Sequence, residues 1–247
     1  AAAEGGAEGS GGAAAQSGAA LRFRDDPAAA LRDAFERTED DLRRYHAKSD
    51  DPSGTCAAVV LLRGGALFCA TVGDSRALLV RVDDRGASSQ PHATQLSTEH
   101  RATEAAERAR IERAGGTVVD GRAMGNLIPS RTLGDFPVKA KNARAVLMEP
   151  SIHRYELTPD DRYLVIGSDG VFDVLSNRAV AKIVAHAKQP GRACNELMRE
   201  LAKRGTLDDA TVVVAHLAEL REPIDEYVTA EAFDAASCSS SSLPPGQ

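Results

Sequence analysis

Residues 163–173 read Tyr-Leu-Val-Ile-Gly-Ser-Asp-Gly-Val-Phe-Asp, and the chain is organised around this stretch. Its first four residues are apolar and favour extended structure, so a strand buried on both faces is predicted over Tyr163–Ile166. Asp169 and Gly170 follow shortly after. A carboxylate at the tip of a buried strand, beside a glycine that allows close approach, suits Mg²⁺ or Mn²⁺. The alternative is an ordinary turn, because Asp-Gly is a common turn dipeptide.

The composition of the 247 residues is that of a globular protein. The chain is 43% hydrophobic and 27% charged, with no Trp, so its core must be built from Val, Leu, Ile and Ala. The formal net charge is −6 and no dominant basic patch is evident, which argues against nucleic acid as a partner. No apolar run approaches the roughly 20 residues that a membrane span needs, and the signal-peptide pattern is missing. We therefore expect neither nucleic acid nor membrane as partners, and we expect a monomer.

Four cysteines occur, none in a C-x-x-C pair and none at zinc spacing from a histidine: Cys56, Cys69, Cys194 and Cys238. The first three lie among apolar residues and are interpreted as small core fillers. A reducing compartment is the simplest interpretation, which predicts a cytoplasmic or nuclear location.

Composition also divides the chain into three segments. Residues 1–20 are almost all Ala, Gly, Ser, Gln and Glu, and are predicted to be disordered. Residues 21–220 are predicted to form the folded domain. Residues 221–247 form a C-terminal extension whose Ser- and Pro-rich tail is predicted to be disordered.

Helices and strands are predicted from the spacing of apolar residues. An amphipathic helix is expected from Asp26 to about His46. Three strand-like runs follow and are joined by two glycine-containing turns, Arg63-Gly64-Gly65 and Gly73-Asp74-Ser75, so an antiparallel meander is predicted over Thr55–Leu62, Ala66–Val72 and Arg76–Val82. Further elements are expected as strands at Thr94–Leu96, Thr117–Val119, Ile152–Leu157 and Thr211–Leu217, and as helices at Thr103–Ala114, after Ser176, and before Gly205. The order is that of an α+β protein.

Three acidic turns stand out, each at the end of an apolar strand: Gly73-Asp74-Ser75, Ser168-Asp169-Gly170 and Leu207-Asp208-Asp209. Carboxylates gathered at one edge of a core repel each other unless cations lie between them. If these turns meet in space, a pair of hard metal ions there would hold and activate a water molecule.

Six short motifs, in order along the chain, resemble those of the metal-dependent protein Ser/Thr phosphatases, the PPM or type 2C family. They are Ser53-Gly54-Thr55-Cys56-Ala57, Val72 to Ala77, Leu96 to His100 with its Glu104 to Gly116 continuation, Gly125 to Leu127 with Ser130 to Asp135, Ser168 to Asp173, and Asp208 to Thr211.

The resemblance implies two face-to-face antiparallel β-sheets flanked by helix pairs, a four-layer α/β/β/α sandwich. It also implies two Mg²⁺ or Mn²⁺ ions that activate a water to attack phosphoserine or phosphothreonine of phosphoprotein substrates. By position, Asp169 and Asp208 match ligands of the two-metal site, and Asp74 matches a ligand of a weaker third site. Gly125 and Arg131 belong to the segment matching a flap beside the cleft. Arg131 either faces the cleft or bridges carboxylates structurally.

The chain departs from the family pattern at its start. Neither the M-E-D-type element nor D-G-H-G-G, whose Asp bridges both metals in the family, is found. One hypothesis is a phosphatase whose N-terminal strands are missing through truncation or an error in gene prediction. A second is a catalytically impaired pseudophosphatase that serves as a binding or regulatory module. A third hypothesis is another two-metal phosphohydrolase whose motifs resemble the family's by convergence.

Overall fold

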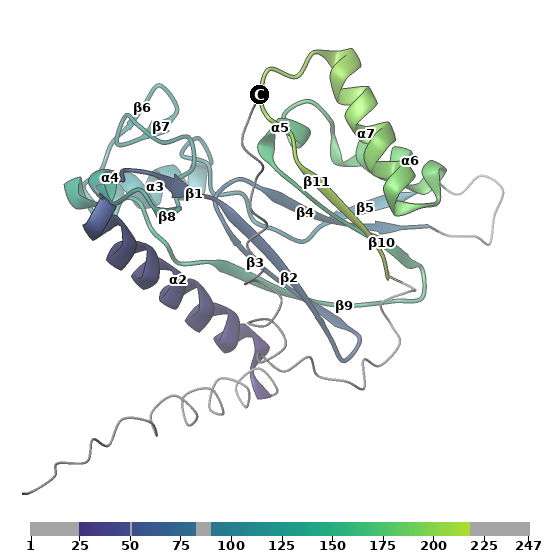
Figure 1. Ribbon diagram of the computed structural model, residues 1–247, viewed down its shortest axis with the longest axis horizontal. Coiled ribbons are helices and arrows are strands. Elements are labelled where there is room, and N and C mark those ends of the chain that lie inside the picture. Colours follow the sequence, from purple (N-terminus) through teal and green to yellow (C-terminus); the bar gives the residue numbers. More distant parts are fainter. Residues whose placement is uncertain (1–24, 50, 83–89, 218–247) are drawn as a thin grey trace, which may run out of the picture. The chain divides into compact units, whose positions relative to one another are not determined.

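The computed structural model describes residues 25–49, 51–82 and 90–217 of the chain. In these residues two antiparallel sheets pack face to face and carry helices on their outer faces (Figure 1). The predicted α+β sandwich with four layers is therefore confirmed. The segments predicted for residues 1–20 and 221–247 lie outside the described residues. None of the helices that are described is both long and apolar enough to cross a lipid bilayer.

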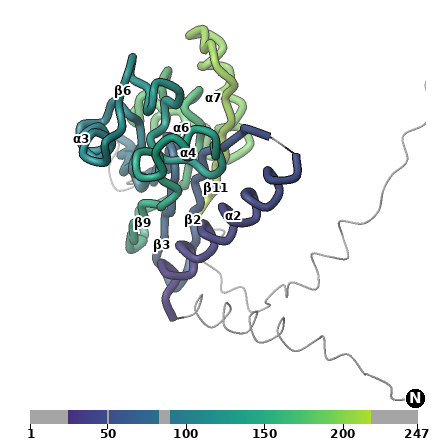
Figure 2. The backbone as a smooth tube through the Cα atoms, turned by 90° about the vertical axis from the view of Figure 1, so that its left-hand side faces the viewer, coloured from purple at the N-terminus to yellow at the C-terminus, as the bar shows by residue number. Residues whose placement is uncertain are grey.

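The first sheet has three strands in the order β2 (Ala57–Arg63), β3 (Ala66–Val72) and β9 (Ser151–Glu156). The central strand β3 is buried along its whole length. Helix α2 (Pro27–Ser49) packs on the outer face of this sheet through Leu31 and Phe35, and it runs alongside β2 and β3 in Figure 2. The expected helix is thus confirmed, although no second helix covers this face in the described residues.

A buried ion pair fixes the middle of α2. Glu39 is 4% exposed, and its carboxylate accepts hydrogen bonds from Nζ of Lys139 at 2.7 Å and from the backbone N–H of Gly134 at 2.8 Å. Gly134 belongs to the short strand β8 (Leu133–Gly134), which pairs with β1 (Gly54–Thr55). Helix α2 therefore anchors the backbone that leads to Thr55.

The second sheet has four strands in the order β11 (Val212–His216), β10 (Asp161–Gly167), β4 (Arg76–Arg81) and β5 (His92–Gln95). As predicted, the central run is buried on both faces. Tyr163 and Val165 pack toward the outer helices, whereas Leu164 and Ile166 pack toward the other sheet. The alternating side chains of one strand thus join two cores.

Helices α6 (Asn177–Ala187) and α7 (Pro190–Arg204) cover the outer face of the second sheet. Oγ of Ser176 caps α6 by accepting from the N–H of Ala179. Gly205 ends α7 in the left-handed conformation, with φ 72°. Both helix boundaries agree with those expected from the sequence.

The predicted three-strand meander is only half right. β2 and β3 pair as a hairpin, but β3 and β4 lie in different sheets, so Gly73-Asp74-Ser75 is a crossover between sheets and not a hairpin turn. Gly73 has φ 95°, and a Cβ at this position would collide with Sγ of Cys56. The glycine that signals a hairpin turn here makes the crossing possible.

Short elements gather at one end of the sandwich (Figure 1). They are α3 (Ala105–Arg113), β6 (Val118–Val119), β7 (Arg122–Ala123) and α4 (Phe136–Lys141). Helix α4 was not predicted, because six residues are too few to show a helical period.

We expect Leu197→Ala to lower the free energy of unfolding by roughly 2–5 kcal/mol, because Leu197 lies on the fully buried face of α7. The neighbouring Met198 is 41% exposed, so Met198→Ala should change this free energy by less than about 1 kcal/mol. Urea denaturation of both variants measures the difference. Equal losses would contradict the placement of the core.

Candidate functional site

A cleft of about 420 Å³ lies where the ends of both sheets meet the segment from Arg122 to Pro129. Its lining residues come from four loops: Thr55, Cys56, Asp74, Ser75, Arg122, Asn126, Leu127, Ile128, Pro129, Ser168 and Asp169. The structure thus brings Asp74 and Asp169 together, although 95 positions separate them in the sequence. Asp208 does not line this cleft.

Asp74 is positioned through His100, a buried histidine that holds the crossover. The N–H of Gly73 donates to Nδ1 of His100 at 3.2 Å, and the N–H of His100 donates to the carbonyl of Gly73 at 2.9 Å. Because Nδ1 accepts, Nε2 carries the proton of the neutral ring and donates to Oγ of Ser151 at 2.8 Å. Burial, and next the positive charge of Arg131, lowers the pKa of His100 to about 4.

Asp169 is positioned by the end of β10. The hydroxyl of Ser168 accepts from the N–H of Thr211 at 3.1 Å, and the N–H of Ser168 donates to the carbonyl of Thr211 at 3.1 Å. Asp169 then opens the one-turn helix α5 (Asp169–Phe172). Its carboxylate accepts from the N–H of Gly170 at 2.9 Å.

The loop that carries Asp208 lies against this turn. A Cβ on Gly170 would overlap the carbonyl of Asp209, so only glycine allows the two backbones to approach this closely. Thr206 also donates its hydroxyl to the carbonyl of Gly170 at 3.3 Å. The Asp208 side chain is exposed and accepts from the N–H of Asp209. That Asp208 shares a metal ion with Asp169 therefore stays a prediction.

Asp74 is the most deeply buried acid of the cleft, at 5% exposure. Its Oδ1 accepts from the thiol of Cys56 at 3.3 Å, and its Oδ2 is buried and has no hydrogen-bond donor among the described residues. Burial, reinforced by the negative charge of Asp169, raises the pKa of Asp74. Burial and the charge of Asp74 raise the pKa of the Cys56 thiol to about 12, so the thiol stays protonated as a donor.

Cys56 therefore differs from the small core filler that we expected. It lines the cleft and orients an acid. Cys69 does lie in the core between the sheets, and Cys194 is half-buried against the core beneath α7.

Arg101 supplies positive charge to this group of acids. Its Nε lies 3.3 Å from Oδ2 of Asp74, and its Nη2 lies 2.7 Å from Oδ1 of Asp173 and 4.0 Å from Oδ2 of Asp169. Neither Arg101 nor Asp173 was predicted as a site residue. Asp173 was foreseeable, because it lies one helical turn after Asp169 and so on the same side of α5.

The carboxylate oxygens of the cleft are the type of ligand that a hard divalent cation binds. Mg²⁺ and Mn²⁺ prefer carboxylate oxygens. Oδ2 of Asp74 is buried, accepts no hydrogen bond from the described residues, and has the guanidinium of Arg101 as its counter-charge, with the carboxylate of Asp169 nearby. In the described part of the chain, however, no group of three or more His, Cys, Asp or Glu side chains is close enough to hold a metal ion. These residues fit part of one cation site, and they do not assemble a two-metal centre by themselves.

Arg131 and Gly125 lie outside the lining of the cleft. Arg131 pairs with Glu107 at 2.7 Å and donates to the carbonyl of Glu149 at 3.0 Å. Burial alone would raise the pKa of Glu107, but hydrogen bonds from Arg131, Arg110 and Ser130 hold it well below the ordinary range. This network supports the structural alternative for Arg131, and its substrate role stays a prediction.

The segment expected to form a flap does border the cleft. Gly125 has φ 69° in the turn that follows β7, and Arg122 before this turn lines the cleft. Arg122 donates to the carbonyl of Asn126 at 2.9 Å, which ties the two sides of the turn together. Arg122 is the one cationic side chain among the described lining residues, and it was not predicted as a site residue.

Comparison with known proteins gives a consistent result. A family profile described as "Protein phosphatase 2C" matches residues 13–210. The human integrin-linked kinase-associated serine/threonine phosphatase 2C is 34% identical over 207 residues, which cover 76% of this chain and 51% of that protein. Probable protein phosphatase 2C 27 of Arabidopsis thaliana is 37% identical over 171 residues, 67% of this chain and 43% of that protein. The chain spans about half the length of the curated relatives it matches.

Solved structures agree on the fold. A serine-threonine phosphatase 2C from Toxoplasma gondii superposes with a TM-score of 0.64 at 19% identity, covering 76% of this chain and 66% of that one. A sex-determining protein of C. elegans superposes with a TM-score of 0.66 at 23% identity, covering 81% of this chain and 50% of that one.

We expect Arg101→Met to lower the melting temperature in the absence of divalent ions, because the acids around Arg101 lose their counter-charge. Mn²⁺ should then raise the melting temperature more in the variant than in the wild type, since it no longer competes with the guanidinium. Thermal melts with and without Mn²⁺ measure both effects.

Arg108→Met serves as the matched control, because Arg108 forms an exposed pair with Glu112 away from the cleft. Identical Mn²⁺ responses of the two variants would contradict a cation site at Asp74 and Asp169.

The low pKa of His100 predicts acid sensitivity. A histidine with a folded-state pKa near 4 and an unfolded-state pKa near 6.5 contributes stability that is fully present above about pH 6.5. That contribution is lost as the pH falls through 4. His100→Gln should therefore flatten the dependence of the unfolding free energy on pH between about 6.5 and 4. Parallel curves for both proteins would show that His100 is not buried in its neutral form.

Proposed function

Since the chain belongs to the protein phosphatase 2C family, we propose that it carries a metal-dependent phosphatase site for phosphoserine and phosphothreonine of proteins. One observation supports this most strongly. Asp74 and Asp169, at the ends of strands from different sheets, line one cleft with the cationic Arg122. Such a cleft offers carboxylates for a divalent ion and a guanidinium for a phosphate.

Each part of the cleft has a role in this proposal. Asp74 and Asp169 would hold Mg²⁺ or Mn²⁺, and Asp208 lies on the adjoining loop as a further ligand. When bound, such ions acidify a coordinated water and neutralise phosphate oxygens. Arg122 attracts the phosphate dianion, whereas Leu127 and Ile128 offer apolar contact to residues beside the phosphorylated one.

The protonated Cys56 has an orienting role and not a nucleophilic one. Its thiol donates to Oδ1 of Asp74, so Oδ2, which lies 3.3 Å from Nε of Arg101, is the oxygen that faces a cation. A thiol with a pKa of about 12 is not the thiolate that nucleophilic attack requires. The proposal therefore excludes a phosphocysteine intermediate at this residue.

A second function, a phosphoprotein-binding module with impaired catalysis, is favoured by Arg101. Its guanidinium already balances Asp74 and Asp173, so these carboxylates are satisfied without a metal ion. In that case Arg101 and Arg122 would bind a phosphorylated peptide without hydrolysing it.

We expect this chain to release phosphate from a phosphothreonine peptide in the presence of Mn²⁺, and Asp169→Asn to reduce the rate at least about 100-fold, because one metal ligand is lost. The matched control is Asp40→Asn on the exposed face of α2, which should leave the rate unchanged. Malachite-green detection of phosphate follows the reaction.

Peptide binding without turnover in a folded sample would favour the binding module. Turnover that survives Asp169→Asn would contradict the assigned site.

A further inference from the structure

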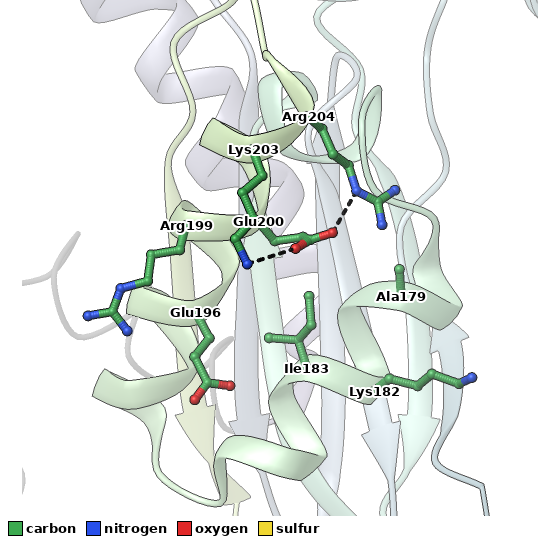
Figure 3. Close-up of a pocket in the computed structure, with 8 residues that line it drawn as sticks. All are labelled: Ala179, Lys182, Ile183, Glu196, Arg199, Glu200, Lys203 and Arg204. Carbon is green, nitrogen blue, oxygen red and sulfur yellow. Dashed lines mark hydrogen bonds and ion pairs between the residues drawn. The ribbon is translucent and has the colours of Figure 1, made fainter.

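A groove of about 520 Å³ runs between α6 and α7 on the surface (Figure 3). Its lining residues come from both helices: Ala179, Lys182, Ile183, Glu196, Arg199, Glu200, Lys203 and Arg204. The buried residues of the same helices, such as Val184 and Leu197, point the other way into the core over the second sheet. The groove is therefore separate from the cleft that holds Asp74 and Asp169.

The two helices are basic in composition, although the whole chain is acidic. Residues 177–204 contain seven Lys or Arg side chains and two Glu, whereas the whole chain has a net charge of −6. Four of these seven cations line the groove: Lys182, Arg199, Lys203 and Arg204.

Both glutamates in the groove are already neutralised by cations of α7 itself. Glu200 pairs with Arg204 at 2.9 Å and with Lys203 at 3.8 Å, and Glu196 pairs with Arg192 at 2.7 Å. These pairs leave the groove a net positive charge. A ligand that carries negative charge would meet little repulsion from these carboxylates.

Two cations of the groove remain available. Lys182 on α6 and Arg199 on α7 are exposed, and neither has a carboxylate within 4.0 Å in the described residues. Figure 3 shows them extending outward from opposite helices, with Ile183 between. The groove thus has a cation on each rim.

The floor of the groove is aliphatic. Ile183 and Ala179 are half-buried there and offer no aromatic ring on which a nucleic-acid base could stack. An aliphatic floor between two cationic rims matches a peptide that alternates acidic and aliphatic side chains.

We propose that the groove between α6 and α7 is a docking site for a short acidic peptide segment of a partner protein. Carboxylates of the peptide pair with Lys182 and Arg199, and one aliphatic side chain packs on Ile183. The site does not depend on phosphatase chemistry, so Asp169→Asn should leave it intact.

The test uses a fluorescein-labelled peptide, Glu-Glu-Leu-Glu-Glu-Ala-Leu-Glu-Glu, and fluorescence anisotropy against the full chain. We expect saturable binding that weakens with salt, and at least about a tenfold loss in the double variant Lys182→Glu/Arg199→Glu. The control is Arg32→Glu/Arg37→Glu, which makes the same charge change on the exposed face of α2 and should alter affinity less than about twofold. Circular dichroism melts confirm that both variants fold.

A milder pair of variants separates the two contacts. Lys182→Ala/Arg199→Ala should weaken peptide binding and reduce its salt dependence. Ile183→Ala should weaken peptide binding without changing its salt dependence. Peptides with Ser for Leu, or with Gln for Glu, should bind more weakly than the parent.

Three results would overturn the proposal. They are an absence of saturable binding by the wild type, an equal loss in the α2 control, and preference for single-stranded DNA or for vesicles with anionic headgroups over the peptide. A wild-type chain that binds the peptide but shows no Mn²⁺-dependent phosphatase activity would refute only the proposed function.

Discussion

The structure depends on the point where the chain leaves one sheet and enters the other. Gly73 adopts a φ of 95° and leaves no room for a side chain beside Cys56. The buried ring of His100 and its backbone bind both polar groups of this glycine. β3 and β4 therefore become the inner strands of two packed sheets, and Asp74 is left at the edge where those sheets meet.

The charge of that edge follows from the crossover. Asp74 is buried beside Asp169, and two like charges in a place of low dielectric need a cation between them. Arg101 supplies such a charge from the residue next to His100, so one short segment both holds the crossover and balances its acid. A divalent ion that entered the cleft would compete with this guanidinium for Asp74.

Much of the fold was predictable because it is local. Neighbouring residues in the sequence determine the alternation of side chains in β10, the start of α6 at Ser176 and the end of α7 at Gly205. Sheet membership is not local, since Gly73-Asp74-Ser75 has the sequence of a hairpin turn, and the crossover is held by hydrogen bonds with the distant His100. The cations of the site were missed for the same reason, because their partners lie far away in the sequence.

Arg101 pairs with Asp173, which lies 72 positions away in the sequence. Likewise, the cations of α6 and α7 line one groove only because the two helices pack together. The acids themselves were found because glycine and aspartate at strand ends are a local pattern. The cations that balance them carry no such pattern, because a surface arginine and an arginine in a site look alike in sequence.

The most direct test of this account is a crystal of the chain soaked in MnCl₂ and measured at the manganese absorption edge. The account predicts anomalous density in contact with the carboxylates of Asp74 and Asp169, with the guanidinium of Arg101 displaced from Asp74. Density only elsewhere, or no density at millimolar Mn²⁺ with Arg101 still paired to Asp74, would contradict a metal site at these two carboxylates.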